Sequence, residues 1–354
     1  MRRLQLYVLK VTATRILGAA AVLMGILQVL DLLEVTTDIL DRGLGVAGVL
    51  YYAALRAPRL VEQIAPISVL AGGLFAFSQL ARESAIIAMR AAGISAYRIV
   101  AMAAPAAAAM MLLDFACAQA IAPRTDPILY AWWRATTPAA EQKEEGPRSF
   151  RVGDDLVIAA ASAPDGRTLS AVKIYRRNQA GRLVERIEAP TATLSAKGWV
   201  LSGAVSTRFE GEAAKSVTAT RLTWPSALGP RDVQALFSDN PAPSASSARR
   251  ALLKGGADRP ASYYETRLLS AFAGPFGALV MLLLSAPVAL ANFRSSQGAV
   301  LLTSGLAAGL VFLVVDGLLS ALGESGAISP ILAVWGGPVV FSALALYALV
   351  TLEG

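Results

Sequence analysis

The segment from residue 81 to residue 95 combines charged, apolar and small residues at helical spacing. The pattern predicts a short amphipathic helix that ends at a glycine. We select one set as a docking surface for a soluble partner: Arg82, Glu83, Ser84, Ile86, Met89, Arg90 and Gly93. The same composition also suits a solvated connector between two longer helices. Both interpretations stay open on these residues alone.

Three carboxylates lie inside or at the end of apolar runs, namely Asp31, Asp114 and Asp316. Ionisable groups in such positions are costly and are usually paired or functional. A hydrolase that used Asp114 and Asp316 would need both carboxylates beside one water molecule. Nothing in their spacing indicates this arrangement. We therefore expect no catalytic residue, and a pairing, cavity-lining or gating role for Asp316.

The chain has no histidine and one cysteine, Cys117. The commonest metal ligand and general base are therefore missing, and no intrachain disulfide can form. There is no glycine-rich phosphate loop. We expect this chain to bind no metal, cofactor or nucleotide. The net charge of +7 comes from basic residues beside apolar runs, which indicates a membrane protein and no nucleic-acid partner.

Six apolar runs must position these side chains. The chain is 55% hydrophobic and 16% charged, with a mean hydropathy of +0.54. A membrane-spanning helix needs about 20 mostly apolar residues. The expected spans are Ile16–Leu33, Ile64–Leu80, Ile99–Ala122, Leu268–Ala291, Ala299–Leu322 and Ile331–Leu352. The first run continues into acidic residues without a cleavage site, which indicates a retained helix.

Basic residues collect in three places that six spans put on one side of the membrane. They are Arg2, Arg3, Lys10, Arg15, Arg82, Arg90, Arg98 and Arg294. Cytoplasmic loops are enriched in Lys and Arg. We therefore expect a multi-pass inner-membrane protein, with both termini cytoplasmic and the region between spans three and four outside.

That region is expected to be all-β. Its alternating runs predict strands at Phe150–Ala159, Leu169–Arg176, Leu183–Ala189, Ala192–Leu194, Trp199–Ser206 and Ser216–Thr223. A polar stretch at 238–247 and a basic stretch at 249–254 suggest a linker. The expected fold is a polytopic α-helical membrane protein with an inserted, jelly-roll-like periplasmic β domain. Its parts are residues 1–133 with the helix near 81–95, residues 134–262, and residues 263–354.

Several short motifs resemble one known family. They are Pro66, Leu80-Ala81-Arg82, the run from Met89 to Ser95, Pro123, Pro275, Leu282–Pro287 and the run from Gly323 through Pro330 to Trp335. Together with the order of six spans and a β insert after the third, they resemble the LptF/LptG permeases of Gram-negative lipopolysaccharide export. Asp31, Asp316 and the run Val172–Tyr175 are more similar to LptG than to LptF.

This resemblance implies a function and partners. The chain would be a permease subunit of an ATP-driven lipopolysaccharide exporter, paired with an LptF-like permease. An LptB-like cytoplasmic ATPase dimer would use ATP and Mg²⁺ and dock on the helix near 81–95. An LptC/LptA-like periplasmic bridge would receive the lipid. We assign to the substrate cavity Gln28, Asp31, Arg56, Arg59 and Asp316, although the two arginines also suit interfacial anchors.

The chain departs from the family pattern near the outer end of the first span, where Gln28, Asp31 and Glu34 stand in place of the basic residues that are frequent there, and at two single positions. Ala85 stands where an acidic residue is usual, and Gln119 stands where glutamate is frequent. Two other functions remain as alternatives. One is a permease for another ATP-coupled lipid or lipoprotein system, although such chains usually have four spans with the large domain after the first. The other is a membrane scaffold or receptor that transports nothing.

Overall fold

The structure is a computed structural model. It describes residues 2–138, 146–153, 155–161, 165–178, 182–196, 198–210, 213–226, 228–237, 244–254, 257–290 and 298–353. Arg294 and residues 238–243 of the expected linker lie outside these ranges. The chain forms two compact units: Met1–Thr125 with Leu269–Gly354, and Asp126–Leu268. We call them the helical unit and the β unit.

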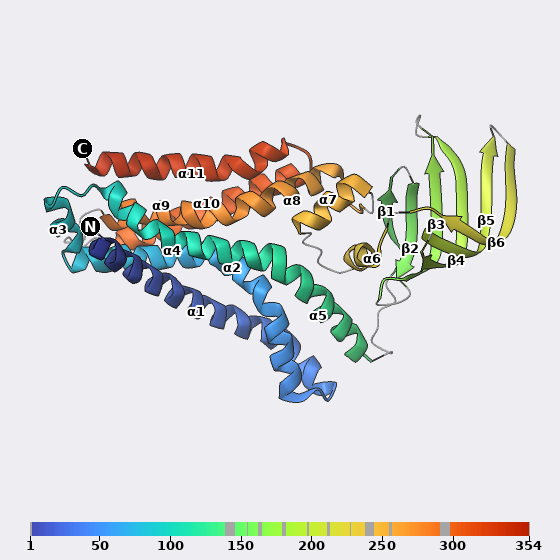
Figure 1. Cartoon of the computed structure of the whole chain (residues 1–354), viewed down its shortest axis with the longest axis horizontal. Helices are drawn as coiled ribbons and strands as arrows, with labels where there is room; N and C mark the ends of the chain where they lie inside the picture. Colours follow the sequence, from blue (N-terminus) through green and yellow to red (C-terminus); the bar gives the residue numbers. More distant parts are fainter. Residues whose placement is uncertain are drawn as a thin grey trace. The chain divides into compact units, whose positions relative to one another are not determined.

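The helices are longer than the apolar runs that predicted them. The first part of the chain forms α1 (Arg2–Asp41), α2 (Gly45–Arg82), α3 (Ala85–Ala91), α4 (Ala96–Ala116), the π-helical turn η1 (Cys117–Ile121) and α5 (Ala122–Thr136) (Figure 1). The last part forms α8 (Ala261–Ala273), the 3₁₀ turn η2 (Gly274–Phe276), α9 (Gly277–Leu290), α10 (Gly298–Glu324) and α11 (Pro330–Glu353). Within the described ranges, six helices or continuous helical stretches are long and apolar enough to cross a membrane. The six-span prediction is confirmed.

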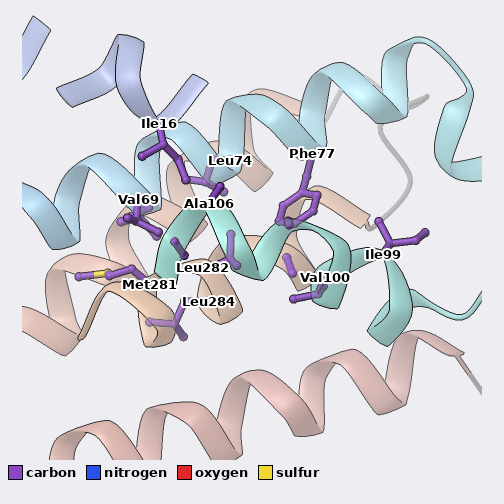
Figure 2. Close-up of a cluster of buried hydrophobic side chains, with 14 of the residues drawn as sticks. Ile16, Val69, Leu74, Phe77, Ile99, Val100, Ala106, Met281, Leu282 and Leu284 are labelled. Carbon is purple, nitrogen blue, oxygen red and sulfur yellow. The ribbon is translucent and has the colours of Figure 1, made fainter. Parts of the chain in front are cut away.

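Helix α2 lies at the centre of the helical unit, between α1 and α9. Two adjacent glycines permit this packing: a Cβ on Gly72 would meet the backbone of Ile16, and one on Gly73 would lie 2.5 Å from the Ser285 hydroxyl oxygen. Around them the core is built from α1, α2, α4 and α9 (Figure 2). Phe77 and Ile99, both fully buried, belong to this core. Small residues thus set the helix separations and larger ones fill the remaining volume.

The outer helices leave much of their apolar surface exposed. Leu310 and Val314 of α10 are 62% and 63% exposed, and Val339 of α11 is 61% exposed. Large contiguous apolar surfaces are rare on soluble monomers. These faces therefore suit contact with lipid or with another membrane subunit.

The β unit contains one antiparallel sheet. Its strands are β1 (Arg148–Val152), β2 (Asp155–Ala161), β3 (Thr168–Arg177), β4 (Leu183–Ser195), β5 (Gly198–Glu210) and β6 (Ala213–Trp224), in the order β1-β2-β3-β4-β5-β6. The inserted β domain is confirmed, although the insert is not all-β because two helices follow its strands. Its topology is simpler than the expected jelly-roll-like arrangement, because a jelly-roll pairs strands that are distant in sequence. The described strands instead form an up-and-down meander.

Two strand predictions were wrong in detail. The run Phe150–Ala159 is two strands, because Gly153 has a φ of +60° and reverses the chain. The runs Leu183–Ala189 and Ala192–Leu194 form one strand, β4, which continues through Pro190. A Cβ on Gly203 of β5 would lie 3.7 Å from the Pro190 ring. That distance is an ordinary van der Waals contact, so glycine is favoured at 203 by its φ of +64° and not by a lack of space.

One face of the sheet is covered by a short helix, α6 (Pro230–Phe237). The Trp199 indole N–H donates to the Leu228 carbonyl at 3.0 Å, and Phe150 packs edge-on against Phe237. The basic part of the expected linker is instead the second half of helix α7 (Ala245–Lys254). An ion pair between Arg250 and Asp232 joins α7 to α6. The basic residues therefore have a packing role that composition alone did not indicate.

Candidate functional site

Helix α3 is a short helix held between two left-handed residues. Ser84 has a φ of +58°, which reverses the chain after α2, and Gly93 has a φ of +78°, which ends α3. The amide of Ile94 donates to the Met89 carbonyl at 3.0 Å and closes the last turn. Figure 1 shows α3 at the same end of the helical unit as both chain termini. The backbone therefore presents α3 as a defined knob.

The structure divides the predicted docking residues of α3 into two groups. Ile86 and Met89 are only 5% and 3% exposed and belong to the core of the helical unit. Arg90 is exposed, as are Arg82, Ser84 and Gly93 at the two ends. The two buried side chains anchor α3, and the exposed ones are accessible to a partner.

One exposed side chain was missing from the predicted docking set. Ile87 is 50% exposed on the outer face of α3. It lies three residues before Arg90, so helical spacing places these two side chains on one side of α3. That spacing was available in the sequence. What the sequence could not show is that the neighbouring Ile86 is buried.

Glu83 contacts two helices. The Gln79 amide donates to one of its carboxylate oxygens at 2.8 Å, and the Tyr7 hydroxyl donates to the other at 2.7 Å. Arg15 donates to Gln79 at 2.9 Å. The hydrogen bonds from Gln79 and then from Tyr7 lower the pKa of Glu83. Glu83 therefore links α1 to the end of α2. Of these partners, only Gln79 was indicated by spacing, at i and i+4.

Each predicted cavity residue at the far end of α1 and α2 has a defined place. Arg56 contacts Asp31 at 3.2 Å, across the α1–α2 interface. Arg59 contacts Glu62 at 2.9 Å within α2. Gln28 lies one turn before Asp31, with a buried amide nitrogen that has no hydrogen-bond partner among the described residues. Each arginine therefore has a carboxylate beside it.

Glu62 was not among the predicted site residues. Its distance of three residues from Arg59 was a usable signal, because side chains at i and i+3 are neighbours on a helix.

Asp316 belongs to a different part of the helical unit. It is half-buried on α10, and a Cβ on Gly337 of α11 would lie 2.8 Å from its carboxylate oxygen. The described contacts thus place Asp316 against α11, whereas Asp31 contacts α2. A single cavity lined by both Asp31 and Asp316 would therefore have to include surfaces other than the α1–α2 and α10–α11 contacts.

Asp114 is 5% exposed on α4, one turn before η1. One of its carboxylate oxygens is buried and has no hydrogen-bond partner among the described residues. A single π-helical turn frequently marks a functional position. Asp114 and Asp316 have different neighbours, so their surroundings do not support a hydrolase that would use both.

A sequence model of the family described as lipopolysaccharide export system permease LptF/LptG matches residues 6–351. The LptG permease protein of Escherichia coli strain K12 is 24% identical over 302 residues, which cover 83% of this chain and 80% of that protein. LptG of Escherichia coli O6:H1 strain CFT073 matches with the same identity and coverage. The six spans, the β insert after the third and this match place the chain in the LptF/LptG family of lipopolysaccharide export system permeases.

Proposed function

We propose that this chain is the LptG-type permease subunit of an ATP-driven lipopolysaccharide exporter in the bacterial inner membrane. Family membership and the six apolar helices support a multi-pass permease that is not itself an enzyme. The observation that carries the proposal is α3: a short helix anchored by Ile86 and Met89, with Ile87 and Arg90 exposed.

Docking of a cytoplasmic ATPase dimer on α3 is the first step of the proposed mechanism. Ile87 would insert into an apolar groove of the ATPase, with Arg90 beside it. ATP and Mg²⁺ would be bound by that LptB-like partner. Because Ile86 and Met89 lie in the core and Glu83 is hydrogen-bonded to α1, a displacement of α3 would be transmitted to α1, α2 and α4 together.

Pairing with a homologous LptF-like permease would use the exposed face of α1. Val22, Gly25, Ile26 and Val29 line a shallow, open apolar hollow on this face. A Cβ on Gly25 would meet nothing within 4 Å, so this glycine has no packing role inside the chain. Small residues permit close approach between helices. Two such faces would enclose a cavity for lipid acyl chains, each buried methylene contributing about 0.8 kcal/mol.

The predicted cavity residues near the end of α1 and in the first half of α2 would give this cavity no net positive charge. Asp31 and Glu62 pair with Arg56 and Arg59. An arginine could bind a lipid phosphate directly only if its carboxylate partner were displaced. We therefore propose that lipid entry exchanges these pairs rather than filling a preformed basic site.

Transfer to an LptC/LptA-like periplasmic bridge would use the β6 edge of the sheet. The opposite edge strand, β1, forms two backbone hydrogen bonds with Ala257, at 2.7 and 2.9 Å between Arg151 and Ala257. β6 ends the sheet on the other side, and Val217 in it is 58% exposed. An uncovered edge strand accepts a further strand from a partner.

The test is affinity purification of the tagged chain in mild detergent, with mass spectrometry of proteins and lipids. The informative variant is Ile87→Asp, because Ile87 is exposed and the substitution leaves the core intact. Ser325→Asp, in the turn after α10, is the control for an added exposed charge. We expect the unchanged protein and the control to retain a homologous permease, an ATPase and lipopolysaccharide, and Ile87→Asp to lose the ATPase.

An ATPase that binds Ile87→Asp as well as the unchanged protein would refute docking through α3. Recovery of a different lipid or a lipoprotein would favour another ATP-coupled system. Recovery of the chain without any ATPase would favour a scaffold or receptor.

A further inference from the structure

A second hollow, of about 440 Å³, lies between the beginning of α1 and the beginning of α4. Two matching sets of side chains line it. Arg2, Leu6 and Leu9 come from α1, and Arg98, Met102 and Pro105 come from α4. In both helices an arginine is followed by an apolar residue four positions later and another three positions after that. Each helix thus contributes a cation in its first turn and an apolar surface over the next two turns.

The two arginines lie at the same end of the hollow, because α1 and α4 begin at the same end of the helical unit (Figure 1) and each arginine belongs to the first turn of its helix. None of the described residues that line the hollow carries a carboxylate. Among the described residues, no ion pair or side-chain hydrogen bond is formed by the guanidinium group of either Arg2 or Arg98. Arg56 and Arg59, at the other end of α2, each contact a carboxylate instead. The two arginines therefore give one end of this hollow a charge of +2 that no carboxylate among the described lining residues compensates.

A ligand that matches this hollow has one anionic group and an extended apolar part. A phosphate diester accepts hydrogen bonds from guanidinium groups, and an acyl chain would cover Leu6, Leu9, Met102 and Pro105. Inorganic phosphate would satisfy the arginines and leave the apolar surface in water. Basic hollows between membrane helices on the cytoplasmic side are a known setting for anionic headgroups.

We propose that the Arg2–Arg98 hollow is a binding site for an anionic phospholipid of the phosphatidylglycerol class, from the cytoplasmic leaflet. The leaflet follows from the excess of Lys and Arg at this end of the helical unit. The site is separate from the exposed face of α1 around Gly25, and the proposal does not depend on which lipid is exported. The bound lipid would bridge α1 and α4 beside the α3 knob.

The experiment measures phosphatidylglycerol and phosphatidylethanolamine retained by the purified full-length protein after detergent washing. The test variant is Arg2→Gln with Arg98→Gln. The matched control is Arg3→Gln with Lys10→Gln, which removes two exposed charges from the same end of α1 but none from the hollow. We expect phosphatidylglycerol binding to fall about thirtyfold in the test variant. The control and phosphatidylethanolamine binding should change little.

A second variant, Leu6→Gln, tests the apolar part of the site, and Leu6 is 57% exposed so the fold tolerates the change. It should weaken phosphatidylglycerol binding, and excess inorganic phosphate should not displace the lipid. Equal losses in test and control, or displacement by phosphate without an effect of Leu6→Gln, would overturn the proposal. ATPase recovery from the same samples separates the two proposals, because the Arg2 and Arg98 changes should leave it intact.

Discussion

Substitution of Gly72 by alanine tests the packing of α1 on α2. A Cβ on Gly72 would meet the Ile16 Cα, and it would lie 2.6 Å from the Ile16 amide nitrogen and 2.8 Å from Cγ1. The first two are backbone atoms, so a side-chain rotation cannot relieve the contact. Ordinary contacts between such atoms are about 3.5 Å. The two helices must therefore separate by about 1 Å at this point.

The energetic cost follows from that separation. A gap of about 1 Å removes up to about half of the dispersion energy of each contact that it opens, and overpacking in cores costs about 1–3 kcal/mol. The contacts at risk include Ile16, Val69 and Leu74, which Figure 2 shows together. Replacing glycine by alanine within a helix returns about 1 kcal/mol. We expect a net loss of up to about 2 kcal/mol in the free energy of unfolding for Gly72→Ala.

Two other glycines provide graded controls. A Cβ on Gly25 would meet nothing within 4 Å, so Gly25→Ala should raise the stability of the isolated chain by about 1 kcal/mol. The atoms nearest to a Cβ on Gly309 belong to the Leu70 side chain and not to a backbone, so a side-chain adjustment can relieve part of that contact. Gly309→Ala should therefore fall between the other two variants.

The assay is unfolding in mixed detergent micelles, followed by tryptophan fluorescence. Trp335 is the tryptophan of the helical unit, whereas Trp199 and Trp224 lie in the β unit. Phenylalanine in place of the other tryptophans would make Trp335 the reporter of the helical unit. Equal stability of Gly72→Ala and Gly25→Ala would refute the close approach of α1 and α2.

Four further substitutions have clear expected outcomes. Ser84→Gly should raise the free energy of unfolding by about 0.5–1 kcal/mol, because it removes a side chain from a left-handed residue. Asp114→Leu should raise the free energy of unfolding by about 1 kcal/mol, because it removes a buried oxygen that has no partner among the described residues. Asp31→Leu should lower the free energy of unfolding, because it leaves Arg56 without its carboxylate. Unfolding in detergent measures both. The Glu83 pKa is lowered by hydrogen bonds from Gln79 and then from the α1 tyrosine. The ionised Glu83 carboxylate therefore stabilises the fold at neutral pH, and this stabilisation is lost as the pH falls through the lowered pKa. The free energy of unfolding of Glu83→Gln should therefore differ from that of the unchanged protein at pH 7, and the two values should converge in acid.

Local patterns in the sequence were sufficient for the six spans, the β-rich insert and the family. Each depends on features within a short stretch of chain, such as about 20 apolar residues or strict alternation. The same patterns indicated the α3 segment and its glycine end. They were less reliable where a local signal was ambiguous. Pro190 suggested a strand end, and the basic stretch at 249–254 suggested a linker, yet both lie inside regular elements.

Tertiary contacts decided which of those residues are available to a partner. Ile86 and Ile87 are adjacent and chemically identical, and only packing against the core buries the first and exposes the second. Glu83 is hydrogen-bonded to Tyr7, which lies 76 residues away in the chain. Arg56 is paired with Asp31 across two helices, 25 residues apart. Hydropathy and spacing report one element at a time, whereas burial and charge pairing depend on which other elements pack against it.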